Sequence, residues 1–86
     1  MYRVSISKAV SKQIESLPSA TALKLVRKLM DLASNPRPSG CVKLIGEETL
    51  RRVRQGDYRA IYEIDDDSRE VKVTKVRNRR ESYRKR

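Results

Sequence analysis

The apolar residues of this chain alternate at the start, then recur at helical spacing, and then alternate again. Residues 2–7 alternate and include β-branched side chains, which predicts a strand. Ser7 can serve as the N-cap of a helix in which Val10, Ile14 and Leu17 recur at helical spacing, and Pro18 stops that helix. The N-terminal region is therefore predicted to be a strand followed by a short helix.

A second helix is predicted after Pro18, where apolar residues again recur every three to four positions. Ser19 can cap this helix, and the breaker-rich stretch Asn35–Gly40 follows it. Together the two helices form a hairpin with an apolar face. The stripe expected to face the core consists of Ala22, Leu25, Val26, Leu29, Met30 and Ala33.

The rest of the chain is predicted to be mainly strands. Val42–Ile45 is a short strand candidate, Leu50–Ile64 has the pattern of a β-hairpin, and Glu70–Val76 forms a last strand after a turn at Asp65–Ser68. Residues 77–86 are too polar to hold a packed helix. The order β-α-α-β-β-β predicts an α+β fold, with the helical hairpin packed on one face of a small, mainly antiparallel β-sheet. A chain of 86 residues is expected to be a single domain over 1–86.

The predicted hairpin carries arginines in an unusual pattern. With a two-residue turn at Gly56-Asp57, Arg54 pairs with Arg59. Side chains alternate along a strand, so Arg52, Arg54 and Arg59 share one face, while Val53, Ala60, Tyr62 and Ile64 take the other. Like charges directly opposite one another are destabilising. We therefore expect an external anion at this face, with phosphate as the leading candidate.

The charge balance narrows the class of partner. Lys and Arg number 21 against 11 Asp and Glu, a net charge of +10, and residues 72–86 hold eight basic residues with Glu81 as the single acid. Such an excess points to nucleic acid, or less often to an anionic membrane or an acidic partner protein. No apolar run approaches the roughly 20 residues of a spanning helix, and no signal-peptide core follows Met1. We expect a cytoplasmic protein without a membrane partner.

The reactive side chains are few. Cys41 is the single cysteine and histidine is absent, so an internal disulfide is excluded and neither a metal site nor a cofactor is expected. The absence of histidine also removes the usual general acid or base near neutral pH. Arginine forks bind phosphate oxygens bidentately, and an aromatic ring can stack on an unpaired base. A single-stranded RNA site could therefore combine the hairpin arginines with the tail residues Arg79, Arg80 and Tyr83.

Three segments, in the same order, resemble the RelE/ParE toxin superfamily and specifically its RelE-like branch. They are Lys43–Gly46, Arg52–Ile64 and Val76–Arg84. The resemblance implies a toxin of a type II toxin–antitoxin pair that enters the ribosomal A site and cleaves mRNA. The implied chemistry is metal-independent attack of a ribose 2′-hydroxyl on the adjacent phosphate, giving a 2′,3′-cyclic phosphate and a 5′-hydroxyl. It also implies a cognate RelB-like antitoxin, expected to be acidic and partly disordered.

The resemblance also implies roles for individual residues. By position, Arg59 stabilises charge on the scissile phosphate, and Arg52 and Arg54 take the places of two basic residues that are lysines in some members. Arg79 resembles the general acid for the leaving oxygen, and Tyr83 the tyrosine that stacks on or orients the nucleotide. Further RNA-binding residues are expected at Arg51, Lys75, Arg77, Arg80 and Arg84.

Two departures from the family pattern bear on mechanism. Arg52 and Arg54 replace lysines, and because a guanidinium essentially never deprotonates in a protein, a general-base role is doubtful for either. The common Gly-His pair before the tail arginines is replaced by Arg77-Asn78, which removes another proton carrier. Electrostatic stabilisation of the phosphorane by positioned cations is the easier mechanism. The identities of the acid and the base stay open.

Two other functions stay open. A ParE-like member would inhibit DNA gyrase by binding and would cleave no RNA. A third possibility is an RNA- or ribosome-binding module without chemistry. The retained arginine set and Tyr83 favour the nuclease.

Overall fold

The computed structural model describes residues 1–39, 41–43 and 50–78, and it confirms the predicted α+β class. Its order is β-α-α-β-β-β-β, one strand more than the predicted order, because a short strand at 42–43 is present in addition to the two hairpin strands and the last strand. The elements are β1 (Arg3–Ile6), α1 (Lys8–Glu15), α2 (Ser19–Asp31), β2 (Val42–Lys43), β3 (Leu50–Gln55), β4 (Tyr58–Asp65) and β5 (Glu70–Asn78).

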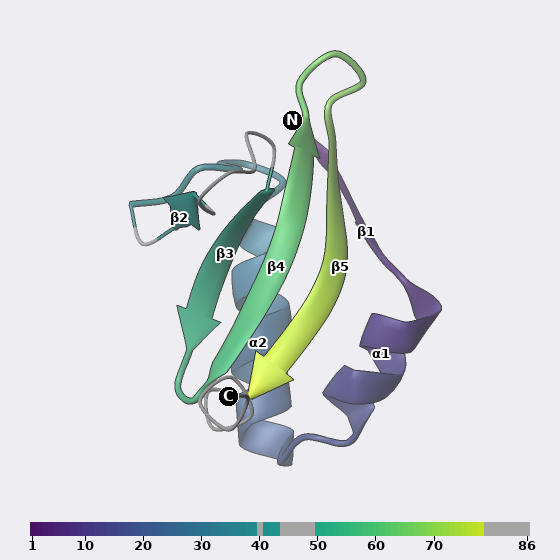
Figure 1. Cartoon of the computed structure of the whole chain (residues 1–86), viewed down its shortest axis with the longest axis vertical. Coiled ribbons are helices and arrows are strands. Elements are labelled where there is room, and N and C mark those ends of the chain that lie inside the picture. The colour runs from purple at the N-terminus through teal and green to yellow at the C-terminus, as the bar shows by residue number, and fades with distance from the viewer. Residues whose placement is uncertain (40, 44–49, 79–86) are drawn as a thin grey trace, which may run out of the picture.

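The five strands form one sheet in the order β1-β5-β4-β3-β2 (Figure 1). β1 pairs with β5 in parallel, and all other pairs are antiparallel. The chain leaves β1 at one edge, crosses through the two helices to the far edge, and returns strand by strand until β5 lies beside β1. A parallel pair needs such a long crossover connection, which the two helices supply here.

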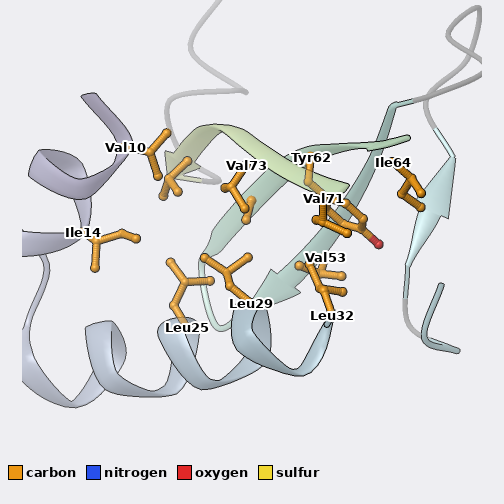
Figure 2. Packing of buried hydrophobic residues seen from close by; sticks show 12 residues of the cluster. Val10, Ile14, Leu25, Leu29, Leu32, Val53, Tyr62, Ile64, Val71 and Val73 are labelled. Atoms are coloured by element: carbon orange, nitrogen blue, oxygen red, sulfur yellow. The ribbon is translucent and has the colours of Figure 1, made fainter. Parts of the chain in front are cut away.

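The core lies between the helices and one face of the sheet (Figure 2). Leu25, Leu29 and Leu32 of the α2 region are at most 1% exposed and point toward the sheet. Their spacing of four and then three residues is one helical face. The predicted stripe was therefore wrong at Met30, which is 46% exposed, and it missed Leu32.

Several predicted boundaries shift. Ser7 caps α1 as predicted, because its side-chain oxygen accepts a hydrogen bond from the Val10 amide. Ser19 does not cap α2: it is already the first helical residue, and Pro18 holds the cap position without a side-chain hydrogen bond. The last strand runs two residues beyond Val76, so residues 77 and 78 belong to the sheet rather than to a tail.

The strand predicted at 42–45 is described only in its first half. Of the strand candidate Val42–Ile45, the structure has Val42–Lys43 as β2, and residues 44 and 45 lie outside the described residues. Within the described ranges, neither helix is long and apolar enough to cross a membrane.

Candidate nucleic-acid interface

The arginine hairpin forms with the predicted register. Arg54 pairs with Arg59 and Gln55 with Tyr58, which leaves a two-residue turn at Gly56-Asp57. Gly56 has φ +60°, whereas Asp57 is not among the described residues with positive φ. A positive φ at the first central residue alone is the signature of a type II′ turn, which matches the twist of the flanking strands.

The sheet has one covered face and one open face. Val53, Ala60 and Tyr62 are at most 2% exposed and belong to the core under the helices. In Figure 1, α2 lies behind the sheet, so the face toward the viewer is the one opposite α2. Because side chains alternate, Arg52, Arg54 and Arg59 take this open face, as the sequence predicted.

A third strand adds cations to the open face. Arg77 of β5 pairs with Arg59, which in turn pairs with Arg54, so three arginines form one row across β3, β4 and β5. The next row holds Arg52, Ile61 and Lys75 in the same strand order. We call the five basic residues of these two rows the cation patch: Arg52, Arg54, Arg59, Lys75 and Arg77.

A β-bulge in β5 decides that the last two join the patch. Tyr62 pairs with Val73, but the preceding Ile61 pairs with Lys75, so Thr74 is an extra residue. Without it, continued alternation from buried Val73 would turn residues 75 and 77 toward the helices. A bulge re-aims side chains in this way and recurs next to functional sites. The sequence signal is the change of valine spacing from 71 and 73 to 76.

Charge in the cation patch is not compensated by neighbouring acids. Of the acidic residues that the structure describes, none forms an ion pair with the five patch cations. At the other end of the molecule, by contrast, Arg3 pairs with Glu70 at 3.2 Å and Arg37 with Asp66 at 2.9 Å. The patch therefore gathers five cations on one face of the sheet without an ion-pair partner among the described acidic residues, which leaves them available to an external anion.

Arg59 lies at the centre of the first row and has an unusual environment. Its Nε is buried and has no hydrogen-bond partner among the described residues. A buried donor without an acceptor costs about 1–3 kcal/mol, and more when the group is charged. Arg59 is also flanked by Arg54 and Arg77, so the centre of the row combines the positive charge of three strands and is suited to an anion.

Arg54 is also fixed through its backbone. Lys28 of α2 donates a hydrogen bond from Nζ to the Arg54 carbonyl at 2.7 Å. β2 pairs with β3 only at residues 51 and 52, so the half of β3 nearest the turn has no described strand on that edge. The bond from Lys28 ties this half of β3 to the helix layer instead. The strand that carries Arg52 and Arg54 is therefore anchored from both the core and the helix.

The remaining predicted site residues are not gathered in the patch. Arg51 pairs with buried Tyr62 and so lies on the helix side of the sheet, where its guanidinium is 3.7 Å from Sγ of Cys41. Strand alternation alone could have shown this. Arg79, Arg80, Tyr83 and Arg84 lie outside the described residues. In the part of the chain that is described, no cluster of three or more His, Cys, Asp or Glu side chains could hold a metal ion.

The patch residues define a limited chemistry. Guanidinium and ammonium groups donate hydrogen bonds to phosphate oxygens and stabilise negative charge that develops on phosphorus. They do not serve readily as bases near neutral pH. The open face can therefore hold a phosphodiester and lower the energy of a charged transition state, while proton transfer requires other groups.

Comparisons with known proteins identify the family and agree with this fold. A family model described as the ParE toxin of the type II toxin–antitoxin system parDE matches residues 4–83. The chain therefore belongs to the RelE/ParE superfamily of type II toxin–antitoxin toxins.

The proteins that this chain resembles in sequence and fold include several named RelE. It is 32% identical over 84 residues to Toxin RelE of Mycobacterium tuberculosis, covering 96% of this chain and 87% of that protein. The fold matches a chain of the archaeal RelE–RelB complex from Pyrococcus horikoshii with a TM-score of 0.82 and 35% identity, over 91% of this chain and 94% of that one. The isolated RelE toxin of E. coli, at 24% identity and a TM-score of 0.78 over 91% of this chain and 84% of that one, supports the fold alone.

Proposed function

We propose that this toxin is a ribosome-dependent endoribonuclease that cleaves mRNA in the ribosomal A site and thereby stops translation. The observation that carries the proposal is the row of Arg54, Arg59 and Arg77 on the open face, with no ion-pair partner among the described acidic residues. Such a row suits a phosphate whose charge increases during a reaction. The site of action is then the cytoplasm, where ribosomes translate.

In the proposed reaction, the 2′-hydroxyl of one nucleotide attacks its own 3′-phosphate. A new bond forms from the 2′-oxygen to phosphorus, and the bond to the 5′-oxygen of the next nucleotide breaks. The products are a 2′,3′-cyclic phosphate and a 5′-hydroxyl, so the proton lost by the 2′-oxygen is balanced by the one gained by the leaving oxygen. No oxidant, metal or cofactor is needed for this balance.

The roles of the chain's residues follow from their charge. Arg59 stabilises the phosphorane, because it stands at the centre of the row and its Nε has no acceptor among the described residues. Arg52 and Arg54 hold the substrate phosphates as permanent cations and do not act as bases. On the family resemblance, Arg79 stabilises the charge that develops on the leaving oxygen, and Tyr83 orients the nucleotide.

A cognate RelB-like antitoxin is the proposed partner that neutralises the toxin. Structures of related toxins contain such a partner, including the RelE–RelB complex of Pyrococcus horikoshii and the RelBE2 complex of Mycobacterium tuberculosis. A net charge of +10 suits an acidic antitoxin, because opposite charge accelerates association.

The first prediction concerns Arg59→Ala. We expect the cleavage rate in a purified translation system to fall by about 10²–10³, the usual cost of one transition-state donor. The measurement is primer extension on a defined mRNA, with chemical identification of the 2′,3′-cyclic phosphate. Growth inhibition should disappear in parallel, while antitoxin binding persists.

The matched control is Arg27→Ala, which removes the same charge from an exposed position on α2. Its cleavage rate should equal that of the unaltered toxin. Cleavage by Arg59→Ala at an undiminished rate would overturn the nuclease proposal. Loss of DNA supercoiling activity of gyrase without any mRNA cleavage would select the ParE-like function instead.

A further inference from the structure

The two rows of the cation patch differ in composition and are separated along the strands. The first row holds Arg54, Arg59 and Arg77, and the second holds two cations on either side of half-buried Ile61. Rows two residues apart along a strand are separated by about 6.8 Å. The rows therefore offer two separate positions for an anion rather than one.

The patch ends after the second row. In the third row, Lys72 stands directly opposite the acidic Glu63, and in the fourth Glu70 is paired with Arg3. Beyond the second row, an acidic residue thus stands in register with the cation of the neighbouring strand. On this face of the described strands, rows of cations without an acid opposite them are found only in the two rows nearest the hairpin turn.

We propose that the open face binds two successive phosphates of a single RNA strand, one at each row, with the RNA backbone running along β4. Arg77 contributes to the first phosphate position beside Arg59, and Lys75 contributes to the second opposite Arg52. The assignment of the first phosphate as the scissile one rests on the proposed function. The binding positions themselves rest on register and charge alone.

The bulge at Thr74 gives this proposal its structural basis. It places both β5 cations on the open face although buried Val71 and Val73 precede them in strict alternation. In the second row, Arg52 of β3 and Lys75 of β5 flank Ile61 of β4, so a phosphate in this row would be held from both sides. The half-buried Ile61 between them offers an apolar floor on which a ribose can pack.

The test uses the whole toxin and a probe that has only two phosphates. The probe is a fluorescein-labelled 2′-O-methyl trinucleotide, which lacks the attacking hydroxyl and cannot be cleaved. Two further probes each carry a neutral methylphosphonate at one of the two linkages. Affinities are measured by fluorescence anisotropy for the unaltered toxin, Lys75→Ala and Arg77→Ala at low salt.

With the fully charged probe, each substitution should weaken binding by about tenfold, the loss of one hydrogen bond between charged groups. The loss of affinity caused by Lys75→Ala should vanish with the probe in which one of the two linkages is neutral. It should persist with the probe in which the other linkage is neutral. Arg77→Ala should show the opposite pattern. Arg77→Lys, which keeps the charge, should recover most of the affinity.

Two controls isolate the effect of position. Lys72→Ala removes a lysine from the same strand and the same face beyond the second row, and Arg27→Ala removes a charge from the helix layer. Both should bind every probe within twofold of the unaltered toxin. The proposal is overturned if either control weakens binding as much as the test variants, or if Lys75→Ala and Arg77→Ala depend on the same linkage or on neither.

This result is separable from the nuclease proposal. If the unaltered toxin shows the two-linkage pattern but cleaves no mRNA on the ribosome, the phosphate positions stand and the enzymatic function fails. If it cleaves mRNA but the variants bind all probes equally, the nuclease stands and the two-phosphate site is overturned.

Discussion

Tyr62 shows at the scale of one residue how the core of this small domain is secured. Its side chain is completely buried, and its hydroxyl donates a hydrogen bond of 2.8 Å to the Pro36 carbonyl. The bond joins the central strand β4 to the loop that follows α2. Burial raises the pKa of the Tyr62 phenol, and the neighbouring Cys41 raises it further.

Removing this hydroxyl tests its contribution to stability. Tyr62→Phe should lower the free energy of unfolding by about 1–2 kcal/mol, because the Pro36 carbonyl loses its buried donor. Urea denaturation monitored by circular dichroism measures the change. Tyr58→Phe is the control, since the Tyr58 hydroxyl has no hydrogen bond to another described residue, and an equal loss in both variants would refute the argument.

The raised pKa adds a pH dependence with a defined sign. Above about pH 10 the unfolded chain ionises its tyrosines while folded Tyr62 stays neutral, so the stability of the native state declines as pH rises. Tyr62→Phe should show a shallower decline. Part of the decline in stability should remain in this variant, because the pKa of Tyr2 is also raised in the folded protein by its hydrogen bond to Asp66.

At the scale of elements, a polar cluster joins three segments that are far apart in the chain. Asp66, in the turn between β4 and β5, accepts hydrogen bonds from the Tyr2 hydroxyl and from both terminal nitrogens of Arg37. It thus ties the start of β1 and the loop after α2 to the end of the sheet opposite the cation patch. The Arg37 hydrogen bond lowers the pKa of the Asp66 carboxyl, and Tyr2 lowers it further.

The cluster predicts the behaviour of the protein in acid. A carboxyl whose pKa is lower in the folded state contributes stability above its unfolded pKa, near 4, and loses it as pH falls through the folded value. Asp66→Asn should therefore flatten the loss of thermal stability between about pH 5 and pH 2. Asp67→Asn, whose side chain contacts no described partner, should follow the unaltered protein, and equal curves for both variants would count against the cluster.

The elements also show where sequence reasoning stops. Alternation predicted the hairpin register correctly, because a two-residue turn leaves one pairing that buries Val53 and Ala60 together. Strict alternation could not place Lys75 and Arg77, because their face depends on an extra residue in the ladder with β4. A bulge is a property of two paired strands and not of one.

At the scale of the whole molecule, the protein combines a small hydrophobic core with a strongly charged surface. The buried cluster contains one aromatic residue, Tyr62, and otherwise aliphatic side chains from every layer of the fold. Domains of this size bury a smaller fraction of their surface than larger domains do and have little stability to spare. Each core leucine of α2 therefore contributes a large share of the free energy of unfolding.

Leu29 tests this reasoning. Leu29→Ala should lower the free energy of unfolding by about 2–5 kcal/mol, since the side chain is fully buried between helix and sheet and its loss leaves a cavity. Leu23→Ala changes the same residue type on the same helix where it is 55% exposed, and should cost well under 1 kcal/mol. Thermal unfolding of the two variants provides the comparison, and similar melting temperatures would refute it.

The sequence by itself determined the α+β class, the hairpin with its II′ turn, and the shared face of Arg52, Arg54 and Arg59. Those features depend on local periodicity and turn chemistry, which a single segment carries. The tertiary structure alone decided that Arg77 completes a row with Arg59, that Leu32 replaces Met30 in the core, and that Arg51 faces the helices beside Cys41. Those outcomes depend on pairing between strands and on which helical face meets the sheet, contacts that form only when distant segments pack together.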